Sequence, residues 1–216
     1  MDNANIKKQR VMTYFIEATE KLIKEDSIDG LSIRKIAAEA GYNSATLYNY
    51  FEDLEHLVLF ASVRYLREYV SILAKKITPQ MNALEKYRTI YTNFNYFAFR
   101  SPEIFHNMFF GKYSSKLSQV ISQYYELFPM ELEGHDDTFK VMLKQGNMHS
   151  RDELVMEELV KEGYVSTEKT QKTLDLLIHL HQSYIYEAWI KGDRIDADEH
   201  NEAFLKLFDY ILEMAH

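Results

Sequence analysis

Residues that interrupt helices are rare in this chain of 216 residues, which has only 7 glycines and 3 prolines. Both residue types punctuate local structure, so their scarcity favours long helices over many short strands. Apolar residues also recur with a helical period almost throughout, as Val11, Phe15 and Ala18 do near the N-terminus. The sequence therefore predicts an all-α fold.

Capping residues and breaks divide this pattern into helices. Ser32, Asn43 and Asp53 each stand before a helical segment and are of the types that cap helix N-termini, and Ser150 does the same later in the chain. Gly41 suits the left-handed residue that ends a helix. The predicted helices cover residues 5–25, 33–39, 44–50, 54–77, 83–100, 101–110, 112–128, 150–163, 168–191 and 198–214.

Length and composition limit the class of protein. A chain of this length forms one large domain or two small ones. It has no cysteine, which excludes disulfides, thiolate metal sites and thiol redox sensing. The N-terminus lacks an apolar signal core and no run of about 18 apolar residues occurs, so we expect no membrane span and a cytoplasmic location.

The net charge of -8 is distributed unevenly. Residues 1–78 carry 11 basic and 11 acidic side chains, whereas residues 79–216 carry 14 and 22. An acidic body repels DNA everywhere except at the neutral N-terminal end. Such a chain should bind a duplex only through that end, and with strong salt dependence.

The stretch "IRKIAAEAGYNSATLYNYF", residues 33–51, contains two short helices joined by a turn with glycine. This is the pattern of a helix-turn-helix unit, whose second helix lies in the major groove of DNA. Leu47 and Phe51 are four residues apart and can face inward. The side chains left more or less outward are Ser44, Ala45, Thr46, Tyr48, Asn49 and Tyr50.

The outward residue types suit DNA recognition. Asn49 can pair with adenine, and Arg34 on the preceding helix can reach guanine or a phosphate. The hydroxyls of Thr46 and Tyr48 are better placed for phosphate oxygens, which fix register rather than sequence. Lys7, Lys8 and Arg10 could contact the DNA backbone beside the site. The alternative is that this unit is only a small helical corner of a core.

Residues 6–57 resemble the DNA-binding domain of the tetracycline-repressor (TetR) family. The resemblance rests on Ala18 and Leu22, on "SIRKIAAEAG" at 32–41 and on "TLYNYF" at 46–51. Two positions depart from the family pattern. Ser27 stands where the family usually has glycine, and Leu54 stands where a phosphate-contacting lysine is common. The second departure removes one expected backbone contact without threatening the fold.

The resemblance implies a three-helix DNA-binding domain at residues 1–53, a connecting helix at 54–77, and a larger helical ligand-binding and dimerisation domain at 78–216. It also implies a homodimer that binds double-stranded operator DNA, usually as a repressor, and releases it when an unknown small-molecule effector binds. No cofactor and no catalytic residue are expected. The alternative is a helical small-molecule-binding protein or enzyme that has kept a vestigial helix-turn-helix.

Aromatic residues are concentrated in residues 87–128, where they make up 13 of 42 residues, against 14% for the chain. Ligand pockets are lined mainly by apolar and aromatic groups, although a well-filled core would show the same concentration. No charged residue dominates this region, so a small apolar or aromatic effector is expected. The predicted ligand-binding residues are Phe97, Phe105, His106, Phe109 and Tyr125.

The last two helices, 168–191 and 198–214, are expected to form the dimer seam as half of an intermolecular four-helix bundle. Their predicted apolar anchors are Ile185, Trp189, Phe204 and Phe208. His179 and His181 lie on different sides of the first of these helices, so they should not share a metal. One of the two is expected to be buried at the seam.

Two other patterns could carry metal chemistry. Glu103 and His106 have the spacing found in di-iron bundles, but a di-iron site needs two such motifs and two further glutamates. The acidic loop at 129–137 could bind a cation, although such loops are normally only solvated. We expect no metal site.

Overall fold

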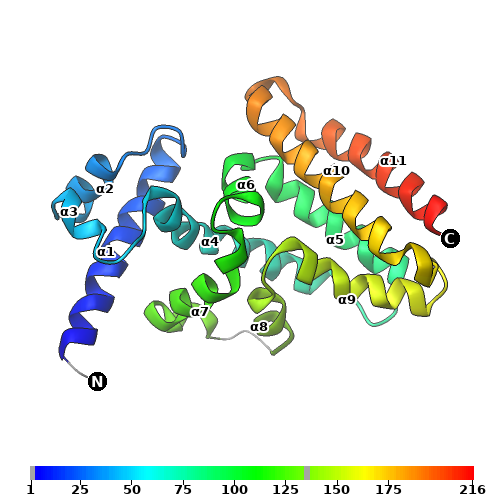
Figure 1. The fold of residues 1–216 in the computed structure, drawn as a ribbon, viewed down its shortest axis with the longest axis horizontal. Helices are drawn as coiled ribbons and strands as arrows, with labels where there is room; N and C mark the ends of the chain where they lie inside the picture. Colours follow the sequence, from blue (N-terminus) through cyan, green and yellow to red (C-terminus); the bar gives the residue numbers. More distant parts are fainter. Residues whose placement is uncertain (1–2, 134–136) are drawn as a thin grey trace.

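The computed structural model describes residues 3–133 and 137–216, and within them the chain forms helices and no strand (Figure 1). The all-α prediction is therefore confirmed. None of the helices in these ranges is long and apolar enough to span a membrane. The elements are α1 (Asn3–Glu25), α2 (Ile33–Ala40), α3 (Ser44–Leu47), α4 (Leu54–Lys76), α5 (Ala83–Ala98), α6 (Pro102–Phe110), η1 (Ser114–Lys116), α7 (Leu117–Leu127), η2 (Pro129–Leu132), α8 (Asp137–Lys144), α9 (Met148–Lys161), η3 (Thr167–Lys169), α10 (Thr170–Lys191), η4 (Gly192–Arg194) and α11 (Ala197–Ala215).

Some boundaries differ from the prediction. The α3 helix is shorter than expected and ends at Leu47. The helix expected at 150–163 begins at Met148, because Asn147 rather than Ser150 caps it. The Oδ1 atom of Asn147 accepts a hydrogen bond from the backbone N–H of Ser150 at 3.0 Å, as an N-cap side chain does. The α8 helix was not expected.

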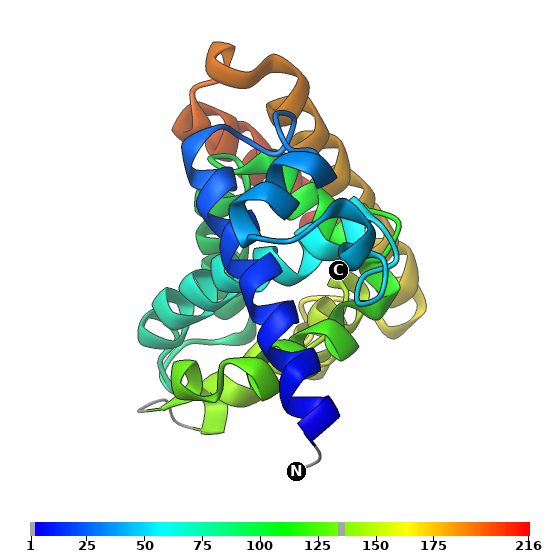
Figure 2. The same ribbon diagram turned by 90° about the vertical axis from the view of Figure 1, so that its left-hand side faces the viewer.

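The first three helices lie at one end of the molecule, which faces the viewer in Figure 2. They pack around an aromatic centre. Phe51 lies between Phe15 of α1 and Phe60 of α4, with ring centroids 6.2 and 5.4 Å apart in edge-to-face geometry. Leu47 is fully buried beside this group. Ser27, which follows α1, has a φ of 88°, the left-handed conformation that favours the glycine expected there. The inward face predicted for the helix-turn-helix is therefore confirmed.

The α4 helix runs from this end into the body of the molecule (Figure 1). Residues 57–63 are all buried, which no amphipathic surface helix would show. The reason is that α1 packs on one side of α4, while α5, α6, α7 and α8 pack on its other sides. The N-terminal end and the body therefore share one continuous helix.

The α10 and α11 helices lie side by side at the opposite end of the molecule from α1–α3 (Figure 1). They pack on α6 and α5, respectively. An aromatic cluster joins α5 to α11, in which the rings of Tyr91, Phe204 and Phe208 have centroid separations of 5.0 to 6.3 Å. This cluster fixes the last two helices to the body.

Candidate nucleic-acid interface and ligand cavity

The turn between α2 and α3 is fixed at three points. The Ser32 hydroxyl accepts a hydrogen bond from the Lys35 backbone N–H at 3.3 Å, at the start of α2. Gly41 ends α2 with a φ of 77°, a conformation that costs other residues free energy. Asn43 Oδ1 accepts from the Thr46 N–H at 2.9 Å and so begins α3. These local contacts set the angle between the two helices of the helix-turn-helix unit.

The residues predicted to contact DNA lie outside the core of this unit. Tyr48 is the most open of the aromatic ones, with 58% of its surface exposed. Because α3 ends at Leu47, Tyr48 to Tyr50 lie in the turn that follows it. The exposed residues are Arg34, Ala45, Tyr48 and Asn49, and the half-buried ones are Ser44, Thr46 and Tyr50.

Some of the basic side chains around the helix-turn-helix unit form ion pairs within the chain. Lys21 pairs with Glu39 at 2.6 Å, and Lys35 pairs with Asp26 at 3.2 Å. Arg34 is exposed and forms no ion pair among the described residues. Its guanidinium is therefore available to a phosphate or to a guanine edge.

A polar junction at Asp53 connects the start of α4 to the segment between α6 and α7. Asp53 accepts hydrogen bonds from the His56 backbone N–H at 2.9 Å, from Lys112 Nζ at 2.6 Å and from the Tyr113 hydroxyl at 2.8 Å. Burial disfavours the carboxylate, but these hydrogen bonds outweigh burial and lower the pKa of Asp53. The Tyr113 ring also packs on His56 at a centroid distance of 4.9 Å.

A second polar junction at Glu20 connects α1 to α7. Glu20 is 8% exposed, and its carboxylate accepts a hydrogen bond from the Tyr124 hydroxyl at 3.1 Å. Arg64 of α4 pairs with the same carboxylate at 3.3 Å. Burial is the largest influence and raises the pKa of Glu20 despite these partners. The DNA-binding end is thus held to the body by buried polar contacts as well as by α4.

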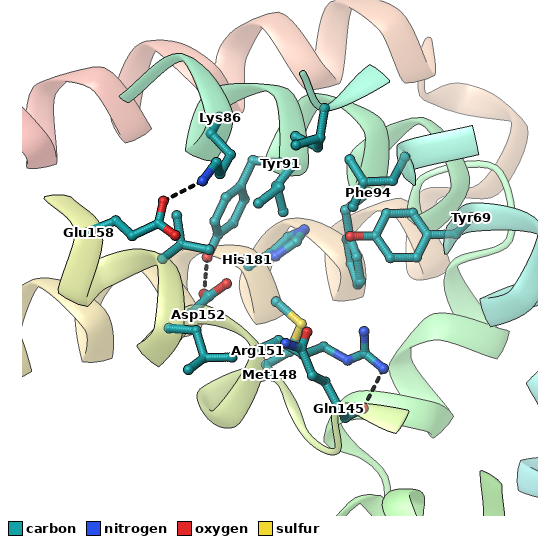
Figure 3. Close-up of a pocket in the computed structure, with 15 residues that line it drawn as sticks. Tyr69, Lys86, Tyr91, Phe94, Gln145, Met148, Arg151, Asp152, Glu158 and His181 are labelled. Carbon is teal, nitrogen blue, oxygen red and sulfur yellow. Dashed lines mark hydrogen bonds and ion pairs between the residues drawn. The ribbon is translucent and has the colours of Figure 1, made fainter. Parts of the chain in front are cut away.

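A cavity of about 280 Å³ lies in the body between α4, α5, α9 and α10 (Figure 3). Three aromatic side chains, those of Tyr69, Tyr91 and Phe94, contribute to its walls. The remaining lining residues are Leu73, Ile77, Lys86, Ile90, Gln145, Met148, Arg151, Asp152, Leu154, Val155, Glu158 and His181. This combination of apolar walls and a few polar groups is typical of small-molecule sites.

Asp152 is a buried carboxyl in this lining, with 3% of its surface exposed. It accepts a hydrogen bond from the Tyr91 hydroxyl (Figure 3). Burial raises the pKa of Asp152 to about 7, although the hydrogen bond from Tyr91 and the nearby charge of Arg151 act in the opposite direction. The carboxyl is therefore close to half protonated at neutral pH.

His181 is the second titratable group buried in the lining, and it is fully inaccessible to solvent. Its ring packs on Phe94 and Tyr91 at centroid distances of 4.7 and 5.0 Å. Neither ring nitrogen has a hydrogen-bond partner. Burial lowers the pKa of His181 to about 3, so the imidazole is neutral. A buried unpaired polar group of this kind costs roughly 1–3 kcal/mol.

The ligand-binding residues predicted from the sequence are not among those that line this cavity. Phe105, Phe109 and Tyr125 are buried in the core. Phe97 packs on Tyr69, and half-buried His106 packs on Trp189. The aromatic concentration therefore mostly fills the core, and the cavity opens one layer away.

Most of the predicted dimer anchors lie inside the chain. Ile185, Phe204 and Phe208 are fully buried within it. Trp189 is half-buried against His106. His181 is likewise buried inside the chain, whereas His179 is exposed. The apolar residues exposed on the last two helices are Leu176, Tyr186, Ile190, Leu207, Tyr210 and Met214.

Within the described residues, no group of three or more histidine, cysteine or acidic side chains is placed to hold a metal ion. His106 of the "EIFH" pattern faces Trp189, with ring centroids 5.2 Å apart. Residues 134–136 of the acidic loop lie outside the described residues.

The described residues thus combine an exposed helix-turn-helix surface on α2 and α3 with a cavity that the following helix, α4, helps to line. Residues 15–59 match the family described as bacterial regulatory proteins, tetR family. This match covers the helix-turn-helix part of the chain.

Similar proteins agree with this match. An uncharacterized HTH-type transcriptional regulator from Haemophilus influenzae is 29% identical over 91 residues, which are 42% of this chain and 49% of the relative. The match thus spans about half of that protein. The fold resembles FadR of Thermus thermophilus, a TetR-family repressor solved with lauroyl-CoA (TM-score 0.56, 16% identity, 91% of this chain and 92% of the other). It also resembles FadR of Bacillus halodurans (TM-score 0.52, 16% identity, 91% and 93%).

The opposite pKa shifts of Asp152 and His181 predict two opposite dependences of the unfolding free energy on pH, which cancel over part of the pH range. The raised folded-state pKa of Asp152 contributes stability that is lost as the pH rises from 3.8 to about 7. The lowered pKa of His181 makes stability fall as the pH falls from 6.5 to about 3. Between pH 3.8 and 6.5 the two slopes, each about 1.4 kcal/mol per pH unit, should cancel.

Replacing one of these two residues should leave only the pH dependence that the other residue causes. Relative to the natural chain, the unfolding free energy of Asp152→Asn should rise with pH across this window, and that of His181→Phe should fall. Urea denaturation at several pH values measures both. Profiles that stay parallel to that of the natural chain would show that neither group has a shifted pKa.

Proposed function

We propose that this regulator is a ligand-responsive repressor that acts as a homodimer on operator DNA. In this proposal residues 1–53 bind DNA, α4 connects, and residues 78–216 bind the effector and the second subunit. The observation that carries the proposal is the position of α4. Six residues, 48–53, separate the end of α3 from the start of α4, which is next to the predicted DNA contacts, and its residues Tyr69 and Leu73 line the cavity.

The effector we infer is a small apolar or aromatic molecule. The cavity volume of about 280 Å³ is near the lower limit of ligand pockets, roughly 300 Å³. The lauroyl-CoA bound by Thermus thermophilus FadR has a long apolar chain, which supports an apolar site in a protein of this fold. The whole of such a ligand would exceed this cavity, so a smaller molecule is the better candidate here.

Coupling between the two sites would pass through α4. A ligand shifts a conformational equilibrium only by its difference in affinity for the two states. An effector that favours a tilted α4 would move the recognition helices away from the groove spacing. A typical coupling free energy of about 1–3 kcal/mol corresponds to a 5- to 150-fold loss of operator affinity, and operator DNA must lower effector affinity by the same factor.

Selection of binding sites from random duplex DNA tests the DNA-binding role. We expect a two-fold symmetric operator whose affinity falls steeply with salt. Asn49→Ala should relax the preference at one base pair by roughly 1–3 kcal/mol, because it removes a base contact. Tyr48→Phe should instead lower the affinity for all DNA sequences about equally, because it removes a phosphate contact.

A chain that enriches no sequence would favour the alternative of a small-molecule-binding protein or enzyme with a vestigial helix-turn-helix. If Arg34→Ala and Tyr48→Phe both leave operator binding intact, this helix does not lie in the groove.

A substitution that fills the cavity should abolish the response to the effector and leave operator binding without effector unchanged. Ile90, which is half-buried in the lining, can be changed to tryptophan. Operator affinity would be measured against a panel of small aromatic and acyl compounds, including lauroyl-CoA. A compound that releases the natural chain should fail to release Ile90→Trp, while the affinity without the compound stays near normal.

The control for this variant is Tyr96→Trp, an exposed site on the same helix. It should respond as the natural chain does. Release that persists in Ile90→Trp would move the effector site away from this cavity.

The exposed apolar residues of α10 and α11 support a dimer in which the two helices pair with their copies. Leu176, Tyr186 and Ile190 recur at helical spacing on α10, and Leu207, Tyr210 and Met214 recur so on α11. Each set therefore lies on one face of its helix. Burying both faces would form a four-helix bundle, and two recognition helices could then sit about 34–36 Å apart.

Leu207→Glu combined with Tyr210→Glu should give a folded monomer with much weaker operator affinity, because charges would be buried at the seam. Sedimentation at micromolar concentration and circular dichroism measure these two properties. Glu202→Lys changes the net charge by an equal amount in the opposite direction, at an exposed position on α11, and should stay dimeric. A natural chain that sediments as a monomer would contradict the proposal.

A further inference from the structure

The cavity is large enough for one aromatic ring with a short substituent. A cavity of about 150 Å³ lined by apolar side chains is enough to bind benzene. The cavity here has about 280 Å³, and its walls include Tyr69, Tyr91 and Phe94. These rings can pack on a bound aromatic ring edge to face or in offset stacks. The size and the walls of the cavity therefore indicate an aromatic ligand body, but they do not indicate which polar group the ligand carries.

His181 supplies an unmet hydrogen-bonding requirement within this lining. Both of its ring nitrogens are buried without a partner, and the ring lies beside Tyr91 and Phe94 in the cavity wall (Figure 3). A neutral imidazole offers one N–H donor and one nitrogen acceptor. A ligand group beside either nitrogen must therefore be able to accept from the N–H or donate to the bare nitrogen, depending on the tautomer.

Charged side chains of both signs line the same small space. Lys86 pairs with Glu158 at its edge (Figure 3). Arg151 donates to the main-chain carbonyls of Gln145 and Gly146. Asp152 accepts from Tyr91. Each of these charged side chains already has a partner, so a charged ligand group would have to displace one of these contacts to gain its own.

We propose that the effector is a small neutral molecule with an apolar, preferably aromatic, body and one hydroxyl group, which binds to the His181 imidazole. This inference rests on the proposed role of the cavity as the effector site. The hydroxyl donates to one ring nitrogen or accepts from the other, and the two tautomers of His181 serve either arrangement. The aromatic body fills the space between α4 and α5.

Four probes of nearly equal size separate the possible ligand groups. Benzyl alcohol carries a hydroxyl, benzylamine a cation, benzoate an anion, and toluene no polar group. Binding of each to the full-length protein would be measured by calorimetry and by the side-chain nitrogen shifts of His181. Benzyl alcohol should bind at least about tenfold more tightly than the other three, a difference of about 1.4 kcal/mol.

Two histidine variants test whether His181 causes this preference. His181→Phe keeps an aromatic ring against Phe94 and removes both nitrogens, so the preference for benzyl alcohol over toluene should disappear. This variant should also melt at a higher temperature, which shows that any loss is not caused by unfolding. His179→Phe changes the exposed histidine two positions earlier on α10 and should keep the preference.

The outcomes distinguish this inference from the proposed function. Binding of all four probes without preference, or a preference that His181→Phe retains, would overturn the hydroxyl assignment and leave the cavity as the effector site. Tightest binding of benzoate or benzylamine would assign a charged ligand instead. Failure of every probe to bind would overturn the ligand class, whereas operator binding, measured without ligand, would decide the regulator role separately.

Discussion

The burial of residues 57–63 of α4 on every side is the constraint on which the rest of the structure depends. These residues are buried without a break, so this part of the helix cannot lie on the surface, and the two ends of the molecule must pack around it. Burial of apolar area at roughly 25 cal/mol per Å² makes this arrangement stable, and close packing makes it stiff. A stiff element common to both ends is what the proposed coupling between the cavity and the helix-turn-helix requires.

Hydrogen bonds between polar side chains further fix how the two ends of the molecule pack together. Asp53 and Glu20 are held by hydrogen bonds that cross from the DNA-binding end to the body, at either side of α4. Buried polar groups are stable only when they are paired, so each junction fixes one geometry between the two ends. His181 is the contrast, because it is fully buried and its ring nitrogens have no partner among the described residues. Asp53 and Glu20 are thus paired where the two ends are joined, whereas His181 is unpaired at the cavity.

The sequence predicted the helix-turn-helix well because its determinants are local. Ser32 and Asn43 bond to backbone groups three residues ahead, and Gly41 supplies the left-handed turn. The cavity was predicted poorly, because its lining comes from four helices that are far apart in sequence. Phe109 illustrates the difficulty: an aromatic residue in a dense cluster has the same local pattern whether it fills the core or faces a space.

The sequence by itself determined the helical class, the caps of α2 and α3, and the identity of the N-terminal unit. These follow from periodicity and from contacts within a few residues, which any helix of this composition would form. Only the tertiary structure decided which apolar residues of α10 and α11 face inward. Phe204 and Phe208 pack on α5, while Leu207 and Tyr210 on the same helix stay exposed. Helical period gives the spacing of a face but not its direction, because direction depends on the neighbouring helix that the face packs against.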